Sequence, residues 1–283
     1  MPKCISPLRY PGGKAKLYNK VSKIVADNFE QKPIYCEPFA GGFGLGISLL
    51  LNDDVSRVII NDLDYCIYAF WMCITDNDLY PLIKEKILGT PVSIEEWKKQ
   101  KNTYKNHENN NILDVGFATF FLNRCNRSGI LSANPIGGIN QTGKYKINCR
   151  FNKETLINQI DKIHQHCEQI EVYNEDALDL IIKIDKRNNI LFNIDPPYIK
   201  AGPELYKNNY VLNDHIKLSE TVKTLNNKWI MTYDNKSIVY DMYKGFLIKD
   251  FDLNYSLESK HKAKELMIFS PEITLKLPSE VLE

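Results

Sequence analysis

The feature that most constrains the fold of this chain is an alternation of short apolar runs with segments of helical periodicity. Apolar runs bounded by turn residues predict strands buried on both faces, and apolar residues spaced three and four apart predict helices. The predicted strands are Ile34–Phe39, Arg57–Asn61, Ile170–Asn174, Ile190–Ile194 and Lys228–Tyr233. The predicted helices, most of them between these strands, are Lys16–Asn28, Gly44–Leu51, Tyr65–Thr75, Thr155–His166, Ala177–Ile184 and Leu212–Asn226. This order predicts a doubly wound α/β fold with a mostly parallel sheet.

The C-terminal part of the chain breaks this alternation. Two strand-like runs, Phe246–Leu253 and Glu265–Ser270, are joined by the polar segment Ser256–Lys264 without a helical pattern between them. Consecutive strands with a polar connection favour an antiparallel hairpin. We therefore expect a mixed sheet that a C-terminal hairpin closes at one edge.

A second interruption lies in the middle of the chain. It contains the helix-like segments Ile94–Tyr104 and Leu113–Arg124, and then the glycine- and asparagine-rich segment Ser128–Asn148. That segment has the turn chemistry of a loop or a short β-hairpin. We predict that the interruption is an inserted module within one α/β domain. The predicted boundaries are 1–76 with 166–283 for the α/β domain, and 77–165 for the insertion.

The insertion is also where positive charge gathers. Ten Lys or Arg residues lie between Lys98 and Lys153, against only Glu108 and Asp114, which gives a local net charge of +8. Because the whole chain carries +1, the remainder sums to −7. Such a distribution suits a module that meets phosphates beside a domain that does not. An ordinary solvated charged face is the alternative explanation.

Composition excludes several other classes of protein. Hydrophobic residues at 43% and charged residues at 25% are typical of a globular protein with a sizeable core. There is no run of about eighteen apolar residues to suggest a membrane span, and no apolar signal segment near the N-terminus. The seven cysteines form no Cys-x-x-Cys pair and the five histidines no metal-ligand spacing. We expect a cytoplasmic protein with reduced thiols and no metal.

A glycine-rich segment follows the first predicted strand. Glu37–Gly46 leads from that strand through glycines into a helix, an arrangement that lets a cofactor lie against backbone and a helix N-terminus. Asp62 ends the second predicted strand, where an acidic side chain can accept hydrogen bonds from ribose hydroxyls. Together they predict a site for an adenosine-containing cofactor. They do not separate a nicotinamide dinucleotide from S-adenosylmethionine.

The tetrapeptide Asp195-Pro196-Pro197-Tyr198 directly follows a predicted buried strand. The two prolines end the strand and fix the direction of a carbonyl group. The Asp195 carboxylate and the Pro196 carbonyl could each accept one N–H of an exocyclic amine, which would aim its lone pair at a methyl donor and stabilise the developing positive charge. Tyr198 could offer a flat face to an extruded base. The motif therefore favours methyl transfer from S-adenosylmethionine to an amino group of a nucleobase, by a Rossmann-like methyltransferase fold.

Several motifs in this order resemble the Dam-type family of DNA adenine-N6 methyltransferases, over nearly the whole chain. The matching segments are Leu8–Lys14, Glu37–Gly46 with Asp62, Phe121–Ile130, Gly143–Tyr145, Arg150–Asn152, Tyr173–Ala177, Asp195–Tyr198 and Met231–Asn235. The resemblance implies S-adenosylmethionine as the cofactor, converted to S-adenosylhomocysteine. The implied cofactor-binding residues are Tyr10, Lys14, Glu37, Phe39, Gly41, Asp62, Asp176, Ala177 and Asp195.

Three of these assignments carry their own alternatives. Tyr10 could equally be core packing. Lys14 could be a solvated surface residue, but beside two glycines it is expected to reach a carboxylate, that of the cofactor's methionine moiety. Asp176 could cap the helix that begins at Ala177, which is compatible with a cofactor contact.

The resemblance also implies that the insertion contacts DNA. Arg124, Arg127, Lys144 and Arg150 are candidates for phosphate contacts, which position a protein without specifying a sequence. Asn126, Asn140, Gln141 and Tyr145 are candidates for reading base edges or filling the gap left by a flipped adenine. An ordinary surface role is the alternative for each of them.

The expected activity is site-specific methylation of the N6 amine of an adenine flipped out of double-stranded DNA. Cytosine-N4 methylation is the nearest rival, but those enzymes usually carry Ser in place of Asp195. Protein glutamine methylation, associated with Asn there, and an inactive DNA-binding regulator are further alternatives. The resemblance suggests a bacterial or phage-encoded monomer or weak dimer, a short recognition site such as GATC, and a partner restriction endonuclease. The sequence fixes none of these last points.

Overall fold

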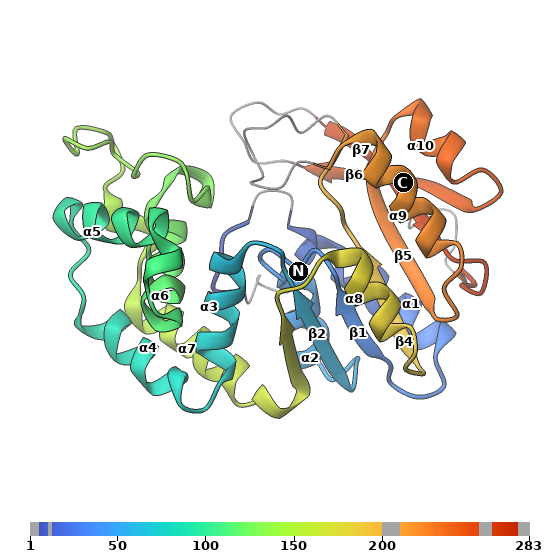
Figure 1. Ribbon diagram of the computed structural model, residues 1–283, viewed down its shortest axis with the longest axis horizontal. Coiled ribbons are helices and arrows are strands. Elements are labelled where there is room, and N and C mark those ends of the chain that lie inside the picture. Colours follow the sequence, from blue (N-terminus) through green and yellow to red (C-terminus); the bar gives the residue numbers. More distant parts are fainter. Residues whose placement is uncertain (1–5, 11–12, 200–209, 255–261, 277–283) are drawn as a thin grey trace.

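The computed structural model describes residues 6–10, 13–199, 210–254 and 262–276, with side chains not described for 252–254 and 262–264 (Figure 1). A seven-stranded sheet forms the centre, with strand order β3-β2-β1-β4-β5-β7-β6. Strands β1 to β5 are parallel, and β7 runs antiparallel to both β5 and β6. The predicted mixed sheet and its antiparallel C-terminal edge are confirmed. The strands are β1 (Ile34–Glu37), β2 (Arg57–Asn61), β3 (Ile170–Tyr173), β4 (Ile190–Ile194), β5 (Lys228–Asp234), β6 (Leu247–Asn254) and β7 (Lys262–Phe269).

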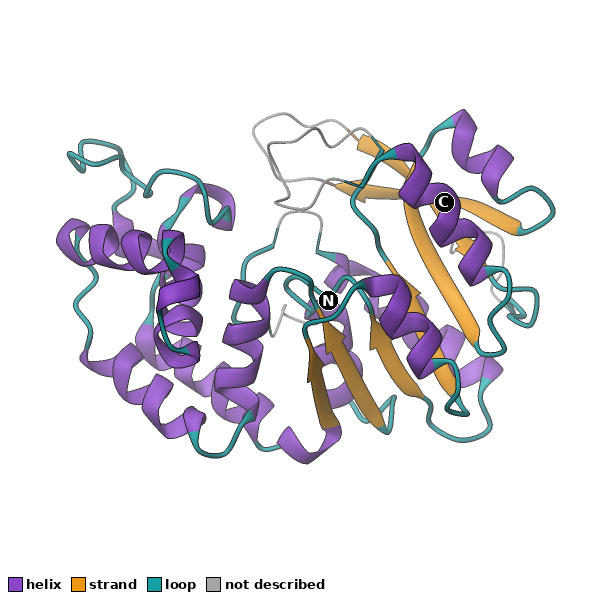
Figure 2. Ribbon diagram, viewed as in Figure 1, coloured by secondary structure: helices purple, strands orange, loops and turns teal. Residues whose placement is uncertain are grey.

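Helices cover both faces of the sheet (Figure 2). Along β2, Val58 and Ile60 belong to one buried cluster and Ile59 to the other, because successive strand side chains point to opposite faces. This two-sided burial explains why the strands read as continuous apolar runs. The helices of the first cluster are α1 (Tyr18–Asn28), α2 (Gly44–Leu51) and α3 (Tyr65–Thr75), and those of the second are α8 (Ala177–Ile184), α9 (Leu212–Val222) and α10 (Ser237–Met242).

The middle of the chain forms a group of helices beside the sheet (Figure 1). Helix α6 packs closely on α3, since a Cβ atom added to Gly116 would lie only 2.7 Å from the carbonyl oxygen of Ala69. Phe70 and Phe120 stack across this contact. The helices therefore share a hydrophobic core with one face of the sheet. They are α4 (Leu79–Gly89), α5 (Ile94–Lys105), α6 (Ile112–Cys125) and α7 (Lys153–His164).

The structure decides between the two expectations for the glycine- and asparagine-rich segment and adds two helices. Residues 128–148, all of which the structure describes, contain no strand, so this segment is the expected loop and not a β-hairpin. Its only ladder-like feature is an isolated bridge between Asn126 and Pro135. Helices α4 and α10 were not predicted. Pro81 obscures the pattern of α4, although proline is tolerated in the first turn of a helix.

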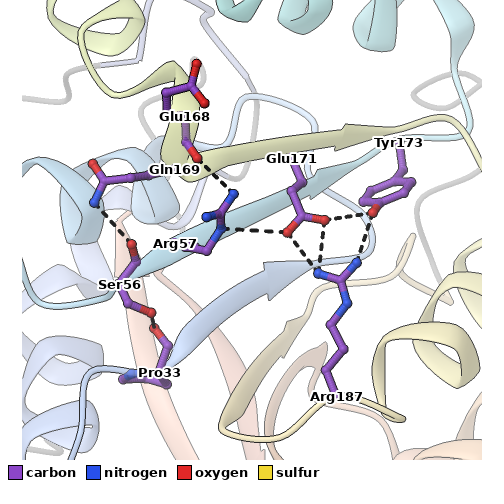
Figure 3. A network of polar contacts seen from close by, with 8 residues as sticks. All are labelled: Pro33, Ser56, Arg57, Glu168, Gln169, Glu171, Tyr173 and Arg187. Carbon is purple, nitrogen blue, oxygen red and sulfur yellow. Dashed lines mark hydrogen bonds and ion pairs between the residues drawn. The ribbon is translucent and has the colours of Figure 1, made fainter.

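Polar contacts fasten the edge strand β3 to its neighbours (Figure 3). The Glu171 carboxylate accepts hydrogen bonds from Arg187 Nη1 at 2.8 and 3.0 Å and from the Tyr173 hydroxyl at 2.7 Å. Arg57 Nε of β2 lies 3.8 Å from the same carboxylate. Charged groups of this kind cover an exposed sheet edge and discourage pairing with another chain. We assign this network a structural role.

Neither a membrane-spanning helix nor a metal site is found within the described ranges. No helix there is long and apolar enough to cross a membrane. No three His, Cys, Asp or Glu side chains there are grouped as metal ligands.

Candidate active site

Acidic side chains gather where the parallel strands end. Glu37 ends β1, Asp62 follows β2 and Asp195 follows β4. Because β1 pairs in parallel with both β2 and β4, these three strands end at one edge of the sheet. This edge is where ligands bind in doubly wound folds.

Asp195 is held on several sides and still reaches solvent, with 26% of its side chain exposed. Its Oδ1 atom accepts a hydrogen bond from Thr232 Oγ1 of β5 and lies 3.2 Å from the Tyr198 hydroxyl. Its Oδ2 atom forms an ion pair with Lys14 Nζ at 3.1 Å. A carboxylate fixed in this way is a preorganised acceptor for a hydrogen-bond donor that arrives from solvent.

Lys14 is buried, with 5% of its side chain exposed, and its ammonium group has three oxygen neighbours. They are the Tyr198 hydroxyl at 2.6 Å, Asp195 Oδ2 at 3.1 Å and Glu265 Oε2 at 3.3 Å. Burial alone would lower the pKa of Lys14, but Asp195 and Glu265 outweigh it and raise that pKa. The predicted carboxylate partner of Lys14 was that of a cofactor, whereas the structure places two carboxylates of the protein there.

Glu265 and Thr232 are members of this cluster that the sequence analysis did not select. Glu265 lies in β7 with only 2% of its side chain exposed, and burial raises its pKa. Its Oε2 atom accepts a hydrogen bond from the Tyr198 hydroxyl at 2.8 Å. An acidic residue at the head of the apolar run Glu265–Ser270 was the available signal, since strands rarely bury a carboxylate without a partner.

The glycine-rich residues of Glu37–Gly46 form the turn between β1 and α2. Gly41 has a φ of +48°, and a Cβ atom there would lie 2.7 Å from the ring of Tyr10, so the ring packs directly on the glycine. The Gly41 amide donates to Asp62 Oδ2 at 2.9 Å, and its carbonyl accepts from Trp71 Nε1 at 3.0 Å. Thus Tyr10, Gly41 and Asp62 do lie together. Burial raises the pKa of Asp62 to about 7.

Glu37 lies deeper, at the end of β1. Its Oε1 atom accepts from the Tyr35 hydroxyl at 2.7 Å and from Asn193 Nδ2 at 3.4 Å. Burial raises the pKa of Glu37 to about 8, and the nearby Asp195 adds to this rise. Phe39, two residues further, is half-buried and meets the ring of Tyr210 edge to face.

Asp176 caps helix α8. Its side chain accepts hydrogen bonds from the amides of Leu178 at 2.9 Å and Asp179 at 3.4 Å, and it remains exposed. Ala177, the first residue of the helix, is buried. The capping role considered from the sequence is therefore present, and exposure leaves room for a ligand contact as well.

One predicted DNA-contacting residue is not on the surface. Asn126 is fully buried, and its amide is used inside the insertion: Oδ1 accepts from Trp97 Nε1 at 2.6 Å, and Nδ2 donates to the carbonyls of Ile130 and Leu131, each at 3.0 Å. It ties α5 to the end of α6 and to the following loop. The sequence pattern gave no sign of this because Trp97 is 29 residues away.

The remaining candidates of the insertion are mostly exposed. Arg124 is half-buried and donates to the carbonyls of Arg150 at 2.9 Å and Pro7 at 3.3 Å. The half-buried Gln141 uses its amide within the loop, donating to the Ile136 carbonyl at 2.8 Å. The exposed candidates are Arg127, Asn140, Lys144, Tyr145 and Arg150.

Arg9 is a basic residue that the sequence analysis did not select. Burial lowers the pKa of Arg9, and the positive charge of Arg150 lowers it further. The Arg9 backbone is also fixed to α6: its N–H donates to Asn123 Oδ1 at 2.7 Å and its carbonyl accepts from Asn123 Nδ2 at 2.8 Å. These bonds connect the segment that leads to Tyr10 with the insertion.

Comparison with known proteins identifies the chain. The model of the D12 class N6 adenine-specific DNA methyltransferases matches residues 10–257. The chain belongs to this family. It is therefore a DNA methyltransferase, and the predicted resemblance is confirmed. The match spans the glycine-rich turn, the insertion and Asp195 to Tyr198, whereas Glu265 lies beyond it.

Two relatives of this methyltransferase are themselves type II methyltransferases. M.CviBI of Paramecium bursaria Chlorella virus NC1A is 20% identical over 254 residues, which cover 88% of this chain and 90% of that protein. M.FokI of Planomicrobium okeanokoites is 24% identical over 278 residues, which cover 89% of this chain and 38% of that protein. Among solved structures, the rRNA methyltransferase aviRa of Streptomyces viridochromogenes aligns with a TM-score of 0.40 and 9% identity, over 93% of this chain and 88% of that chain.

Proposed function

We propose that this methyltransferase transfers a methyl group from S-adenosylmethionine to the N6 amine of an adenine flipped out of double-stranded DNA. The observation that carries the proposal is Asp195. It is a carboxylate at the carboxyl end of a central strand, held by Thr232 and Lys14 and still partly exposed. Its position after β4 and before two prolines gives the target amine a fixed acceptor.

The strand ends support a cationic, adenosine-containing methyl donor. Asp62 lies beside the glycine turn, where its carboxylate could accept hydrogen bonds from ribose hydroxyls. Asp195 adds negative charge that suits a positively charged sulfonium group, and Glu37 adds a polar carboxyl group whose pKa burial raises to about 8. Tyr10 and Phe39 provide ring surfaces near the turn, and Asp176 an exposed carboxylate at the end of β3. When bound, S-adenosylmethionine would supply an electrophilic methyl group and leave as a neutral thioether.

The chain's own part in the chemistry is to hold the amine. The Asp195 carboxylate and the Pro196 carbonyl each accept one N–H of the adenine, and the nitrogen lone pair then faces the methyl carbon. As the new C–N bond forms, positive charge on the nitrogen is stabilised by these acceptors, and one N–H proton leaves to water. Tyr198 offers its ring as a stacking surface for the flipped base, with Pro197 fixing its approach.

Residues 77–165 are proposed to bind the DNA, and 1–76 with 166–283 to carry the cofactor and the chemistry. Support comes from the exposed basic side chains of the insertion and from Arg9, whose backbone is bound to Asn123 of α6. Arg124, Arg127, Lys144 and Arg150 would meet phosphates. Asn140 and Tyr145, both exposed, would lie near the bases. Because two relatives are type II methyltransferases, a restriction endonuclease is a further proposed partner.

Nucleoside analysis of methylated DNA tests the proposal. The purified protein is incubated with mixed-sequence duplex DNA and S-adenosylmethionine carrying an isotopically labelled methyl group, and the digested product is examined by mass spectrometry. We expect label in N6-methyl-2′-deoxyadenosine only. Label in N4-methyl-2′-deoxycytidine would replace the adenine assignment, and no label in any nucleoside would reject DNA methylation by this protein.

A further inference from the structure

The two oxygens of Asp195 are already engaged in this structure, although the proposed reaction needs one of them for the adenine amine. Oδ1 faces the hydroxyls of Thr232 and Tyr198, and Oδ2 faces the Lys14 ammonium. A carboxylate has about four acceptor sites, so Asp195 can also accept from the substrate amine, and it is freer to do so when another group holds some of these partners. Glu265 contacts two of the three partners, Tyr198 and Lys14.

We propose that Glu265 is a positioning residue for methyl transfer, which retains the Tyr198 hydroxyl and the Lys14 ammonium so that Asp195 keeps an acceptor site open for the substrate amine. This inference rests on the proposed function for the identity of that amine. Glu265 itself is nearly fully buried and does not touch the substrate in this scheme.

The phenol geometry is the first argument. A tyrosine hydroxyl has a single hydrogen to donate. Its oxygen lies 2.8 Å from Glu265 Oε2 and 3.2 Å from Asp195 Oδ1, so the hydrogen bond to Glu265 is the shorter one. Burial and the two carboxylates raise the pKa of Tyr198 far above its ordinary value, which keeps the hydrogen in place. Glu265 thereby orients the ring on which the base is proposed to stack.

The charge balance is the second argument. A buried ammonium group needs a nearby counter-charge and hydrogen-bond acceptors for its protons. Lys14 has Asp195 and Glu265 as carboxylate neighbours, at 3.1 and 3.3 Å. When Asp195 accepts a hydrogen bond from the amine, Glu265 still provides an acceptor for Lys14. Without Glu265, the ammonium group would lose one of these carboxylate neighbours and would compete more strongly with the substrate for Asp195.

The third argument is that strand pairing fixes the backbone position of Glu265. It lies in β7 directly opposite Asp234 of β5, and the same ladder pairs Met267 with Thr232. Directly opposed residues of an antiparallel pair project to the same face. The strand that carries Thr232 therefore also fixes the backbone position of Glu265, so the two groups around Asp195 are placed by one rigid unit.

Chemical labelling of Lys14 tests the charge argument without any substrate. Wild type, Glu265→Gln and the exposed control Glu272→Gln are acetylated competitively at mildly alkaline pH, with the exposed Lys183 as an internal reference. Loss of a counter-charge lowers the pKa of Lys14, so its relative labelling should rise roughly tenfold per pKa unit in Glu265→Gln only. Equal labelling in all three proteins would overturn the inference and leave the proposed function untouched.

Steady-state kinetics test the positioning role itself. Glu265→Gln keeps an acceptor oxygen for the Tyr198 hydroxyl, whereas Glu265→Ala removes it. We expect kcat to fall roughly tenfold in the first and about a hundredfold in the second, with KM for DNA changed less than about threefold. The loss of kcat in the double variant Tyr198→Phe, Glu265→Ala should be smaller than the two single losses combined, because the two changes share the Tyr198–Glu265 bond. Additive losses, or an unchanged kcat in Glu265→Ala, would contradict the inference. If wild type methylates no DNA at all, the proposed function fails, and the labelling result still stands alone.

Discussion

The hydroxyl of Thr232 donates a hydrogen bond to Oδ1 of Asp195, and this bond joins the ends of two neighbouring strands. Register explains it: Ile194 of β4 lies opposite Met231 of β5, so the next residue of each strand is brought alongside the other. The acceptor is thus held by a side chain of the sheet itself, in addition to the ion pair with Lys14. Its direction is set before any substrate binds, which is the preorganisation that charge stabilisation in a transition state requires.

Removing this hydroxyl should slow methyl transfer. In Thr232→Val the side chain keeps its shape but cannot donate to Asp195, so the carboxylate gains freedom to rotate. We expect kcat to fall roughly tenfold, the equivalent of one hydrogen bond to a charged group, with KM for DNA nearly unchanged. Thr232→Ser, which keeps the hydroxyl, is the matched control and should stay within about threefold of wild type. Equal rates in the valine and serine variants would argue against a role for the bond.

Replacing Glu37 by Gln should change the pH dependence of stability. Burial raises the pKa of Glu37 from its ordinary value of 4.5 to about 8, so the folded protein binds more protons than the unfolded chain between these values. The wild type therefore loses stability as pH rises through this window, and Glu37→Gln does not share that loss. We expect the free energy of unfolding of the variant, relative to that of wild type, to rise by at most about 5 kcal/mol between pH 5 and pH 9. Thermal unfolding at the two pH values measures this change. A stability difference that does not change with pH would contradict the assigned environment of Glu37.

Asn123 should be needed to keep the N-terminal segment on the insertion. Its buried amide accepts from the Arg9 N–H and donates to the carbonyls of Arg9 and Gly129. In Asn123→Ala these buried backbone groups lose their partner, and the free energy of unfolding should fall by about 2–3 kcal/mol. The exposed Asn148→Ala serves as the control and should change it by less than about 0.5 kcal/mol. Chemical denaturation measures both changes. An unchanged free energy of unfolding in Asn123→Ala would show that the N-terminal segment is held by other contacts.

The basic side chains of the insertion should govern the salt dependence of DNA binding. The double variant Arg127→Ala, Arg150→Ala removes two exposed cations, which are proposed to neutralise phosphates. Plots of the logarithm of the binding constant against that of salt concentration should then flatten by about 2 in slope. Lys183→Ala, on α8 of the catalytic part, should leave the slope as it is. An unaltered slope in the double variant would indicate that DNA binds to another surface of the protein.

Much of the fold follows from local patterns. Helices α2, α3 and α8 have the predicted bounds, as do strands β2 and β4, because in these elements periodicity and terminating residues agree. The antiparallel β7 was expected from the absence of a helix after β6. The predicted connection Ser256–Lys264 falls largely outside the described residues, as do Pro11 and Gly12 of the N-terminal motif.

The site was predictable only where its chemistry is encoded in neighbouring residues. Asp195 and Tyr198 belong to one tetrapeptide, and the glycine turn with Asp62 spans two adjacent strands. Glu265, in contrast, meets Tyr198 across 67 residues of sequence, through a strand pairing that composition does not reveal. Asn126 shows the opposite error: it has the chemistry of a base reader, but Trp97 and two carbonyls use its amide inside the insertion.

The central claim is that the Asp195 carboxylate accepts a hydrogen bond from the target amine during methyl transfer. The variant Asp195→Ala tests this claim most directly. Transfer of labelled methyl groups to duplex DNA is measured beside the binding of DNA and of S-adenosylmethionine to the same protein. We predict that methylation is abolished while both ligands still bind measurably. Methylation at the wild-type rate in Asp195→Ala would contradict the account.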